Sequence, residues 1–432
     1  MKSDFDKYEQ HLRELTECRT ISDNEYFSQA EFDKFDAVLR KNYPLVFEKG
    51  EMIENGNATF IRIKGKSDLS PLVLMSHKDV VHEGNVKKWK SSPFEGRVIN
   101  GKMFGRGTFD CKASLCCIFE AMENLLNEGF VPEKDVYILS TSNEEIAGND
   151  APNAVAYFKN RNITPGLVVD EGGAMLKNPF PSKIKHFAMV GAVERSSQRM
   201  IFDVPSEENA KKLQKKIKKF KAGNYEITPE ISSLAKGLSK HLYFPVGNLA
   251  GALAKHKKAG AFLLTHAGKD ARAFCGASFG FSKIEKGEKE ALEKEYGELR
   301  NPLRIFISGN YYNKLSSLSP KVKNLAEKYG AKLICESGRE ADEPISQSSE
   351  GYKFFEKIVT ECFENSAVLP YPVLGRTDAR YFVGFAHCVI RCIPVEITLS
   401  QMMKFHCPNE NITVSSLAPA VEFYKTLLTF FS

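Results

Sequence analysis

The chain has 432 residues, 42% hydrophobic and 26% charged, which is typical of a folded protein with an ample core and two or three domains. Its net charge of +6 is small for this length and does not indicate nucleic-acid binding. The charged N-terminal segment lacks the apolar core of a secretory signal, and no stretch reaches the ~18 to 20 apolar residues of a membrane span. We therefore expect a cytoplasmic protein without a membrane partner, whose ten cysteines are reduced thiols.

The first part of the chain alternates between helical and strand patterns. The predicted elements are, in order, helices at 5–18 and 29–42, strands at 58–65 and 71–77, a helix at 113–129, and strands at 136–142 and 166–170. The helix at 113–129 is expected to stop at Gly129. Short buried strands that alternate with helices predict an α/β fold, with a mostly parallel sheet and helices on both faces.

The pattern changes after about residue 185. Segment 188–204 is predicted to form two strands joined by a turn. Segment 208–223 is predicted to be a helix with Leu213, Ile217 and Phe220 on one face and lysines on the other. The lysines indicate a solvated helix face rather than an RNA-binding surface.

Residues 225–345 are polar, lysine-rich and weakly patterned. The patterns of the first part return with an amphipathic helix at 350–363 and a buried run at 385–395. We therefore expect one α/β domain built from 1–187 and 346–432. A smaller α+β domain, 188–345, is expected to be inserted into it.

Imidazole and carboxylate side chains occur near the ends of several apolar runs. They are His77, Asp110, the pair Glu144–Glu145, Asp170 and His406. In open α/β sheets the reactive groups gather at the carboxyl ends of the strands. Two imidazoles and three carboxylates are the ligand types of a zinc site with an open position, and they also suffice for two metals bridged by one carboxylate.

The same residues lie within a series of short motifs. These are HKDVV (77–81), Trp89, PFEG (93–96), GRGTFDCK (105–112), EEIAG (144–148), DEGG (170–173), TDARYF (377–382) and HCPNE (406–410). In this order the motifs resemble those of the dinuclear zinc exopeptidases that include aminoacylase, carboxypeptidase S, carboxypeptidase G and succinyl-diaminopimelate desuccinylase. The resemblance covers about 1–190 and 340–432, and it makes the insert a lid or dimerisation domain.

The resemblance implies two Zn²⁺ ions, with Co²⁺ or Mn²⁺ as alternatives. His77 and Asp170 would bind one ion, and Glu145 and His406 the other. Asp110 would bridge the two ions. Glu171 remains the alternative to Asp170, because other branches of the family use a glutamate next to this aspartate.

The resemblance also implies roles for the remaining motif residues. Glu144 would be the general base for a metal-activated water, and Asp79 would orient the His77 imidazole. Arg380 would bind a substrate carboxylate, with an ion pair to Asp378 as the structural alternative. The peptide bond after Asp110 is cis in relatives and is expected to be cis here.

The expected activity is zinc-dependent hydrolysis of a peptide or N-acyl amino acid bond in a small substrate with a free carboxylate. A monomer or a homodimer would fit. The insert departs from the family because a Gly-His-Ser-Ser segment, which supplies an oxyanion-stabilising histidine, is missing, and Arg376 replaces a glycine. His256 and His266, on either side of a predicted strand at 259–265, are candidate substitutes. The alternative function is a weakened or non-catalytic metal-binding homologue that uses the altered insert for binding.

Overall fold

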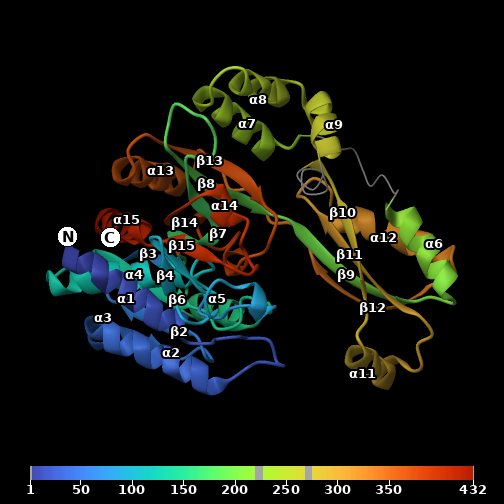
Figure 1. Cartoon of the computed structure of the whole chain (residues 1–432), viewed down its shortest axis with the longest axis horizontal. Coiled ribbons are helices and arrows are strands. Elements are labelled where there is room, and N and C mark those ends of the chain that lie inside the picture. The colour runs from blue at the N-terminus through green and yellow to red at the C-terminus, as the bar shows by residue number, and fades with distance from the viewer. Residues whose placement is uncertain (1, 219–226, 268–274, 432) are drawn as a thin grey trace.

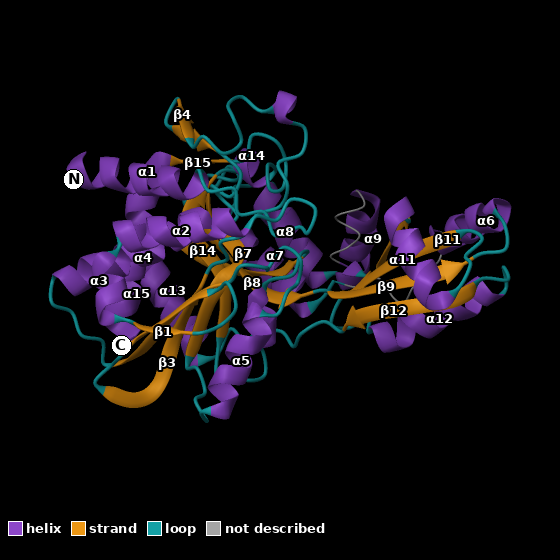
Figure 2. Cartoon of the chain, turned by 90° about the horizontal axis from the view of Figure 1, so that it is seen from below, coloured by secondary structure: helices purple, strands orange, loops and turns teal. Residues whose placement is uncertain are grey.

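The computed structural model describes residues 2–218, 227–267 and 275–431 and has two unequal parts, each built around its own sheet (Figures 1 and 2). The larger part contains an eight-stranded sheet with helices on both faces, and the smaller part a four-stranded sheet. The predicted α/β class with an inserted α+β unit is confirmed.

The large sheet combines strands from both ends of the chain. Its order is β1 (Glu51–Ile53), β2 (Thr59–Ile63), β6 (Lys134–Ser140), β3 (Ser67–Met75), β7 (Leu167–Lys177), β14 (Val389–Ile397), β8 (His186–Glu194) and β13 (Ser366–Val373). The pairs β3–β6, β3–β7, β7–β14 and β8–β13 are parallel, and β1–β2, β2–β6 and β7–β8 are antiparallel. The sheet is therefore mixed, with parallel strands at its centre.

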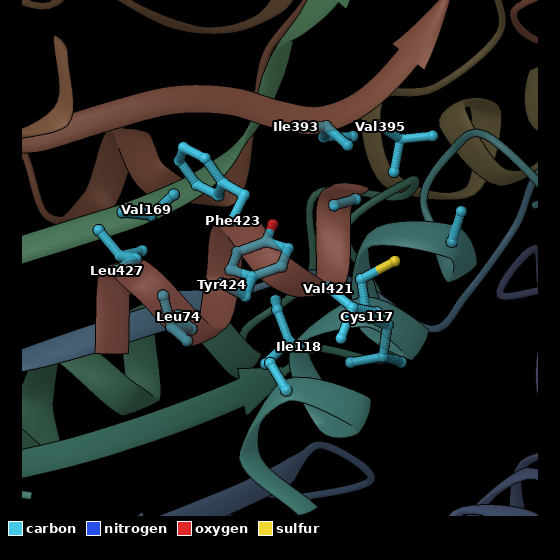
Figure 3. Packing of buried hydrophobic residues seen from close by; sticks show 14 of the residues in the cluster. Leu74, Cys117, Ile118, Val169, Ile393, Val395, Val421, Phe423, Tyr424 and Leu427 are labelled. Atoms are coloured by element: carbon cyan, nitrogen blue, oxygen red, sulfur yellow. The ribbon is translucent and has the colours of Figure 1, made fainter. Parts of the chain in front are cut away.

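Apolar side chains on both faces of β3 explain why its sequence is a continuous apolar run. Leu72 and Leu74 belong to the core on one face, and Val73 and Met75 to the core on the other. The first face is covered by α1 (Lys2–Thr16), α2 (Gln29–Asn42), α3 (Pro44–Lys49), α4 (Lys112–Asn127), α13 (Glu350–Cys362) and α15 (Leu417–Phe431). Figure 3 shows Ile118 of α4 and Tyr424 of α15 within this core. The opposite face is covered by α5 (Asp150–Asn160) and the 3₁₀ helix η2 (Asp378–Tyr381).

Short elements complete the larger part. They are the 3₁₀ helices η1 (Val86–Lys88) and η3 (Val414–Ser416), helix α14 (Leu399–Met402), and a three-stranded sheet of β4 (Arg97–Ile99), β5 (Lys102–Phe104) and β15 (Asn411–Thr413). All ten cysteines are free thiols. No helix in the described ranges combines the length and the apolar character needed to cross a bilayer.

The smaller part is an antiparallel sheet with helices. Its strand order is β10 (Ser278–Lys283), β11 (Pro302–Gly309), β9 (Ser196–Asp203) and β12 (Lys332–Arg339), and it carries α6 (Glu207–Lys218), α11 (Lys286–Tyr296) and α12 (Leu315–Glu327). Leu213 and Ile217 of α6 are buried in its core, as predicted, whereas Phe220 lies outside the described residues. The chain passes between the two sheets at Arg195, because β8 pairs in the large sheet and β9 in the small one. The expected boundary at 187/188 falls near the start of β8.

Two local predictions were wrong. The strand expected to end at Asp170 continues to Lys177, because Gly172 and Gly173 let β7 pass very close to its neighbours. A Cβ on Gly173 would lie 2.1 Å from the carbonyl oxygen of Met189. The expected strand at 259–265 is part of helix α9 (Lys257–Ala267), since alanine and leucine favour a helix and the segment has no β-branched residue before its last position.

Candidate metal centre

The loops that carry the motif residues meet at one edge of the large sheet. Because β3, β6, β7 and β14 are parallel, the segments after β3, β6 and β14 leave the sheet on the same side. His77 follows β3, Glu144 and Glu145 follow β6, and His406 follows α14 beyond β14. Asp110 lies two residues before α4, and its peptide bond to Cys111 is cis, as expected.

Asp110 lies between two imidazoles. Its Oδ1 is 3.0 Å from Nε2 of His77, and its Oδ2 is 2.9 Å from Nε2 of His406. The same nitrogen of His406 is 3.2 Å from Oε1 of Glu145. Each oxygen of one buried carboxylate thus faces a different histidine, although the two histidines are far apart in the sequence. This is the arrangement expected of a bridging ligand.

Asp79 connects the two neighbouring loops. Its Oδ1 and Oδ2 accept the backbone N–H groups of Glu144 and Glu145, at 3.2 and 3.1 Å. The Nδ1 atom of His77 lies 2.9 Å from the backbone oxygen of Asp79 and 3.4 Å from its Oδ1. An N–H on Nδ1 would donate here and leave Nε2 to face Asp110. Asp79 therefore contacts both the imidazole and the loop that carries the two glutamates.

Glu171 lies closer to the cluster than Asp170 does. Potential ligand atoms form groups, and the atoms of each group lie within 4.8 Å of one another. One group comes from His77, Glu144 and Glu171, and another from Asp110, Glu145 and His406. Asp170 belongs to neither group, and its Oδ2 accepts the backbone N–H of Ala379 at 2.8 Å. The side chain that the sequence analysis treated as the alternative is thus the one grouped with His77.

Burial of many carboxylates together raises their pKa values. Desolvation raises the pKa of Glu145 to about 7 and that of Asp170 to about 6, and it raises the pKa of Glu144 and Glu171 well above the usual range. Burial alone would also raise the pKa of Asp110, but hydrogen bonds from His406 and His77 hold it well below its usual value. Such a concentration of carboxylates next to two imidazoles fits divalent cations, whose charge would offset the cost of burying the anions.

Asp378 adds another carboxylate near the cluster. Its Oδ2 is buried and has no hydrogen-bond partner within the described part of the chain. Burial, followed by the charge of Asp170, raises the pKa of Asp378 to about 7. A buried acceptor without a partner at this edge of the sheet is consistent with a ligand or cation that approaches it. The sequence analysis had considered Asp378 only as an ion-pair partner.

A buried ion pair supports the turn before α4. The Nη1 atom of Arg106 lies 2.5 Å from Oε2 of Glu410, and both side chains are buried. Oε1 of Glu410 accepts the backbone N–H groups of Phe109 and Asp110 at 3.0 and 3.2 Å. The sequence analysis gave neither Arg106 nor Glu410 a role, although both lie within its motifs, at 105–112 and 406–410. Their pairing joins these two motifs in the fold.

Arg380 lies where the two parts of the molecule meet. Its guanidinium lies over the ring of Tyr381, at 4.6 Å from the centroid, and it lines a small cavity together with Arg376 and Arg339. Arg339 of β12 donates to the backbone oxygen of Arg380 at 2.8 Å. Within the described ranges, no ion pair joins Arg380 to Asp378. Its Nη2 atom donates to the Tyr381 hydroxyl at 3.0 Å, and Glu194, Glu340 and Asp342 line the same cavity.

Neither candidate substitute for the missing histidine is part of the cluster. His256 ends helix α8 (Val246–Lys255), and His266 lies in α9 with its Nδ1 2.7 Å from the backbone oxygen of Phe262. Both side chains are exposed, and neither is in a group of potential metal ligands among the described residues. The suggestion that a strand presents these two histidines to the site is wrong, because the segment is helical.

The chain is similar to known metallopeptidases. Residues 73–429 match the model of peptidase family M20/M25/M40. The chain is 25% identical to a probable carboxypeptidase S-like 2 of Dictyostelium discoideum, over 97% of this chain and 84% of that protein. It is 24% identical to the N-fatty-acyl-amino acid synthase/hydrolase PM20D1.1 of Danio rerio, over 91% of this chain and 80% of that protein.

A solved structure has the same fold. The M20 family metallo-carboxypeptidase Sso-CP2 from Sulfolobus solfataricus superimposes with a TM-score of 0.67 at 17% identity, covering 96% of this chain and 97% of that one. The family match spans most of the chain, including every candidate ligand. The chain therefore belongs to peptidase family M20/M25/M40 and is a metallo-hydrolase.

Proposed function

We propose that the chain hydrolyses the amide bond of a peptide or an N-acyl amino acid with a free carboxylate, using two zinc ions. Cobalt or manganese are the alternative metals, since imidazole and carboxylate ligands suit all three. The observation that supports this proposal most is the position of Asp110 between His77 and His406. When bound, the ions would polarise the substrate carbonyl and lower the pKa of a water molecule.

Four of the proposed ligands follow the sequence analysis: His77, Asp110, Glu145 and His406. For the fifth, the grouping with His77 favours Glu171. Asp170 would instead hold η2 in place through the N–H of Ala379. The alternative is that Asp170 binds the metal and Glu171 does not. Metal analysis of the Glu171→Gln and Asp170→Asn variants distinguishes the two assignments.

Glu144 would act as the general base. Its backbone N–H is held by Asp79, which directs the side chain toward the groups around His77. Burial raises the pKa of Glu144 well above the usual range, which suits a group that accepts a proton near neutral pH and returns it to the leaving amine. Glu145 would bind metal, so these adjacent glutamates would have different roles.

Arg380 would bind the carboxylate of the substrate. Its fork of N–H donors matches a carboxylate, and its position at the junction of the two parts places it beside Asp378 in η2. Relatives named as carboxypeptidase S-like and as an N-fatty-acyl-amino acid synthase/hydrolase support substrates of this class.

The ten free thiols support a reducing compartment such as the cytoplasm.

The test combines metal content with hydrolysis of dipeptides and N-acyl amino acids. Protein loaded with zinc should bind close to two ions. Glu144→Gln should lower kcat by at least about 100-fold and leave metal content unchanged. Exposed Glu207→Gln in α6 is the matched control and should change neither quantity.

Two results would overturn the proposal. An active Glu144→Gln variant would mean that another group takes the proton. A wild-type protein that binds two metals but hydrolyses none of the substrates would favour the non-catalytic alternative, in which the missing Gly-His-Ser-Ser segment has abolished activity.

Replacing Arg380 by lysine should raise KM for substrates with a free carboxylate, but not for their carboxamide analogues.

A further inference from the structure

Helices α8 and α9, and the turn that joins α7 (Pro229–His241) to α8, carry large exposed apolar side chains. Each of the following is more than half exposed: Tyr243 (53%), Phe244 (81%), Val246 (54%), Leu249 (57%), Phe262 (63%) and Leu263 (53%). We call these six residues the apolar helix surface. In Figure 1, α8 lies on the far side of α7 from the large sheet, so its outer face points away from the protein. Exposed large apolar side chains gathered on neighbouring elements often mark an interaction site.

Several glycines of these helices lie at close contacts with the rest of the protein. A Cβ on Gly237 of α7 would lie 2.2 Å from the Leu369 side chain of β13, which leaves no room for a larger residue. A Cβ on Gly247 of α8 would lie 2.7 Å from the backbone oxygen of Leu242, and one on Gly260 of α9 would lie 2.5 Å from the Ile227 side chain. An ordinary surface helix buries its large apolar residues and exposes its polar ones. Here Leu253 and Leu264 pack on a small core around Ile231, but Leu249, Phe262 and Leu263 remain exposed.

These helices contain a single acidic residue, Glu230, which is buried at the start of α7. Residues 231–267 include no aspartate or glutamate, although one residue in eight of the whole chain is acidic, 54 of 432. The segment has five exposed lysines: Lys236, Lys240, Lys255, Lys257 and Lys258. Apolar side chains and uncompensated positive charge thus occur on one helical unit.

We propose that the apolar helix surface binds reversibly to an anionic lipid membrane. The aromatic and aliphatic side chains would enter the boundary between head groups and acyl chains, while the lysines would contact the anionic head groups. This is attachment to one leaflet without a spanning segment. The sequence analysis expected no membrane partner, because it considered only spans.

Charge argues against a second copy of this chain as the occupant. In a symmetric dimer formed through this surface, the same patch would meet itself. Lysines without acidic neighbours would then face lysines, and like charges at close range repel. An anionic lipid surface is complementary to both the apolar and the charged component. The inference rests on this surface alone and does not depend on the proposed substrate.

The test is sedimentation of the full chain with lipid vesicles. It should bind vesicles that contain phosphatidylserine much more tightly than vesicles of phosphatidylcholine alone, and added salt should weaken the binding. Replacing Lys255, Lys257 and Lys258 together by glutamine should lower the partition coefficient on the order of 100-fold, at about fivefold per lysine. Phe244→Ser should lower it on the order of 10-fold.

Matched control variants distinguish binding through this surface from nonspecific adsorption to lipid. Replacing Lys215, Lys216 and Lys218 of α6 by glutamine removes the same charge from another exposed helix. Leu69→Ser removes an apolar side chain, 57% exposed, from β3. Both controls should keep binding within about twofold of the wild type, since neither touches the proposed surface. All variants should keep the unfolding curve of the wild type.

Three results would overturn the proposal. The first is no binding to vesicles of either composition. The second is an equal loss of binding in the control variants, which would indicate a diffuse electrostatic effect. The third is a wild-type protein that elutes as a dimer in size-exclusion chromatography and a Phe244→Ser variant that elutes as a monomer, with equal vesicle binding by both. In that case a second copy covers the surface.

Discussion

Glu410→Ala tests the buried ion pair that supports the metal-site turn. The variant removes the ion-pair partner of Arg106, whose side chain is almost completely buried. In the described part of the chain, Arg106 forms no ion pair with any other carboxylate. Leaving a buried charge without its partner costs about 3 to 5 kcal/mol. The N–H groups of Phe109 and Asp110 lose their acceptor as well. Since a folded protein is stable by only about 5 to 15 kcal/mol, the loss should be evident.

Urea unfolding of the chelator-treated protein, followed by far-UV circular dichroism, measures this effect without any contribution from bound metal. Glu207→Ala is the control: its pair with Lys211 is exposed, and its loss should cost no more than about 0.5 kcal/mol. A double variant, Arg106→Met with Glu410→Leu, should recover part of the loss because it leaves no unpaired charge. Destabilisation of less than about 1 kcal/mol by Glu410→Ala would refute the argument.

The other predictions concern the ligands and one pH-dependent contact. Glu171→Gln should lower metal content in elemental analysis more than Asp170→Asn does; the reverse order would assign the metal to Asp170. Asp79→Asn should weaken metal affinity by about 10- to 100-fold in competition with a chelator, and unchanged affinity would contradict its orienting role. Although partial burial opposes the shift, Lys41 and Asn42 lower the pKa of Glu14 to about 2. The stability that Glu14 contributes is therefore present above its unfolded pKa of about 4.5 and lost as the pH falls toward 2. Glu14→Gln should cost at most about 1 kcal/mol at pH 7 and almost nothing at pH 2, so a difference independent of pH would count against this contact.

The local sequence determined much of the larger part. The run at 71–75 is apolar at every position, so it predicts a strand buried on both faces, and β3 is such a strand. Gly129 follows α4 with a positive φ of 79°, which the sequence indicated through glycine's tolerance of this conformation. Such features depend on residues close in sequence, and their physical causes are therefore visible in the sequence alone.

Tertiary structure decided the features that depend on approach between distant segments. The continuation of β7 past Asp170 requires Met189 and Arg391 to come very close to Gly173, and no local pattern encodes that approach. The helical conformation of 259–265 had a local signal, since alanine and leucine favour a helix, but the short apolar run fits either type of element. For short apolar segments, packing is what selects between helix and strand.

The candidate site divides in the same way. The motifs supplied the ligand types and their order, because two imidazoles and several carboxylates near strand ends are chemically informative by themselves. The sequence could not choose between two adjacent acids, since which one approaches His77 depends on the path of β7 and on the N–H of Ala379. It also could not reveal that Glu410 holds the turn before Asp110, because folding brings together residues about 300 positions apart. The sequence thus determined which chemical groups are available, and the packing of distant segments decided which of them meet.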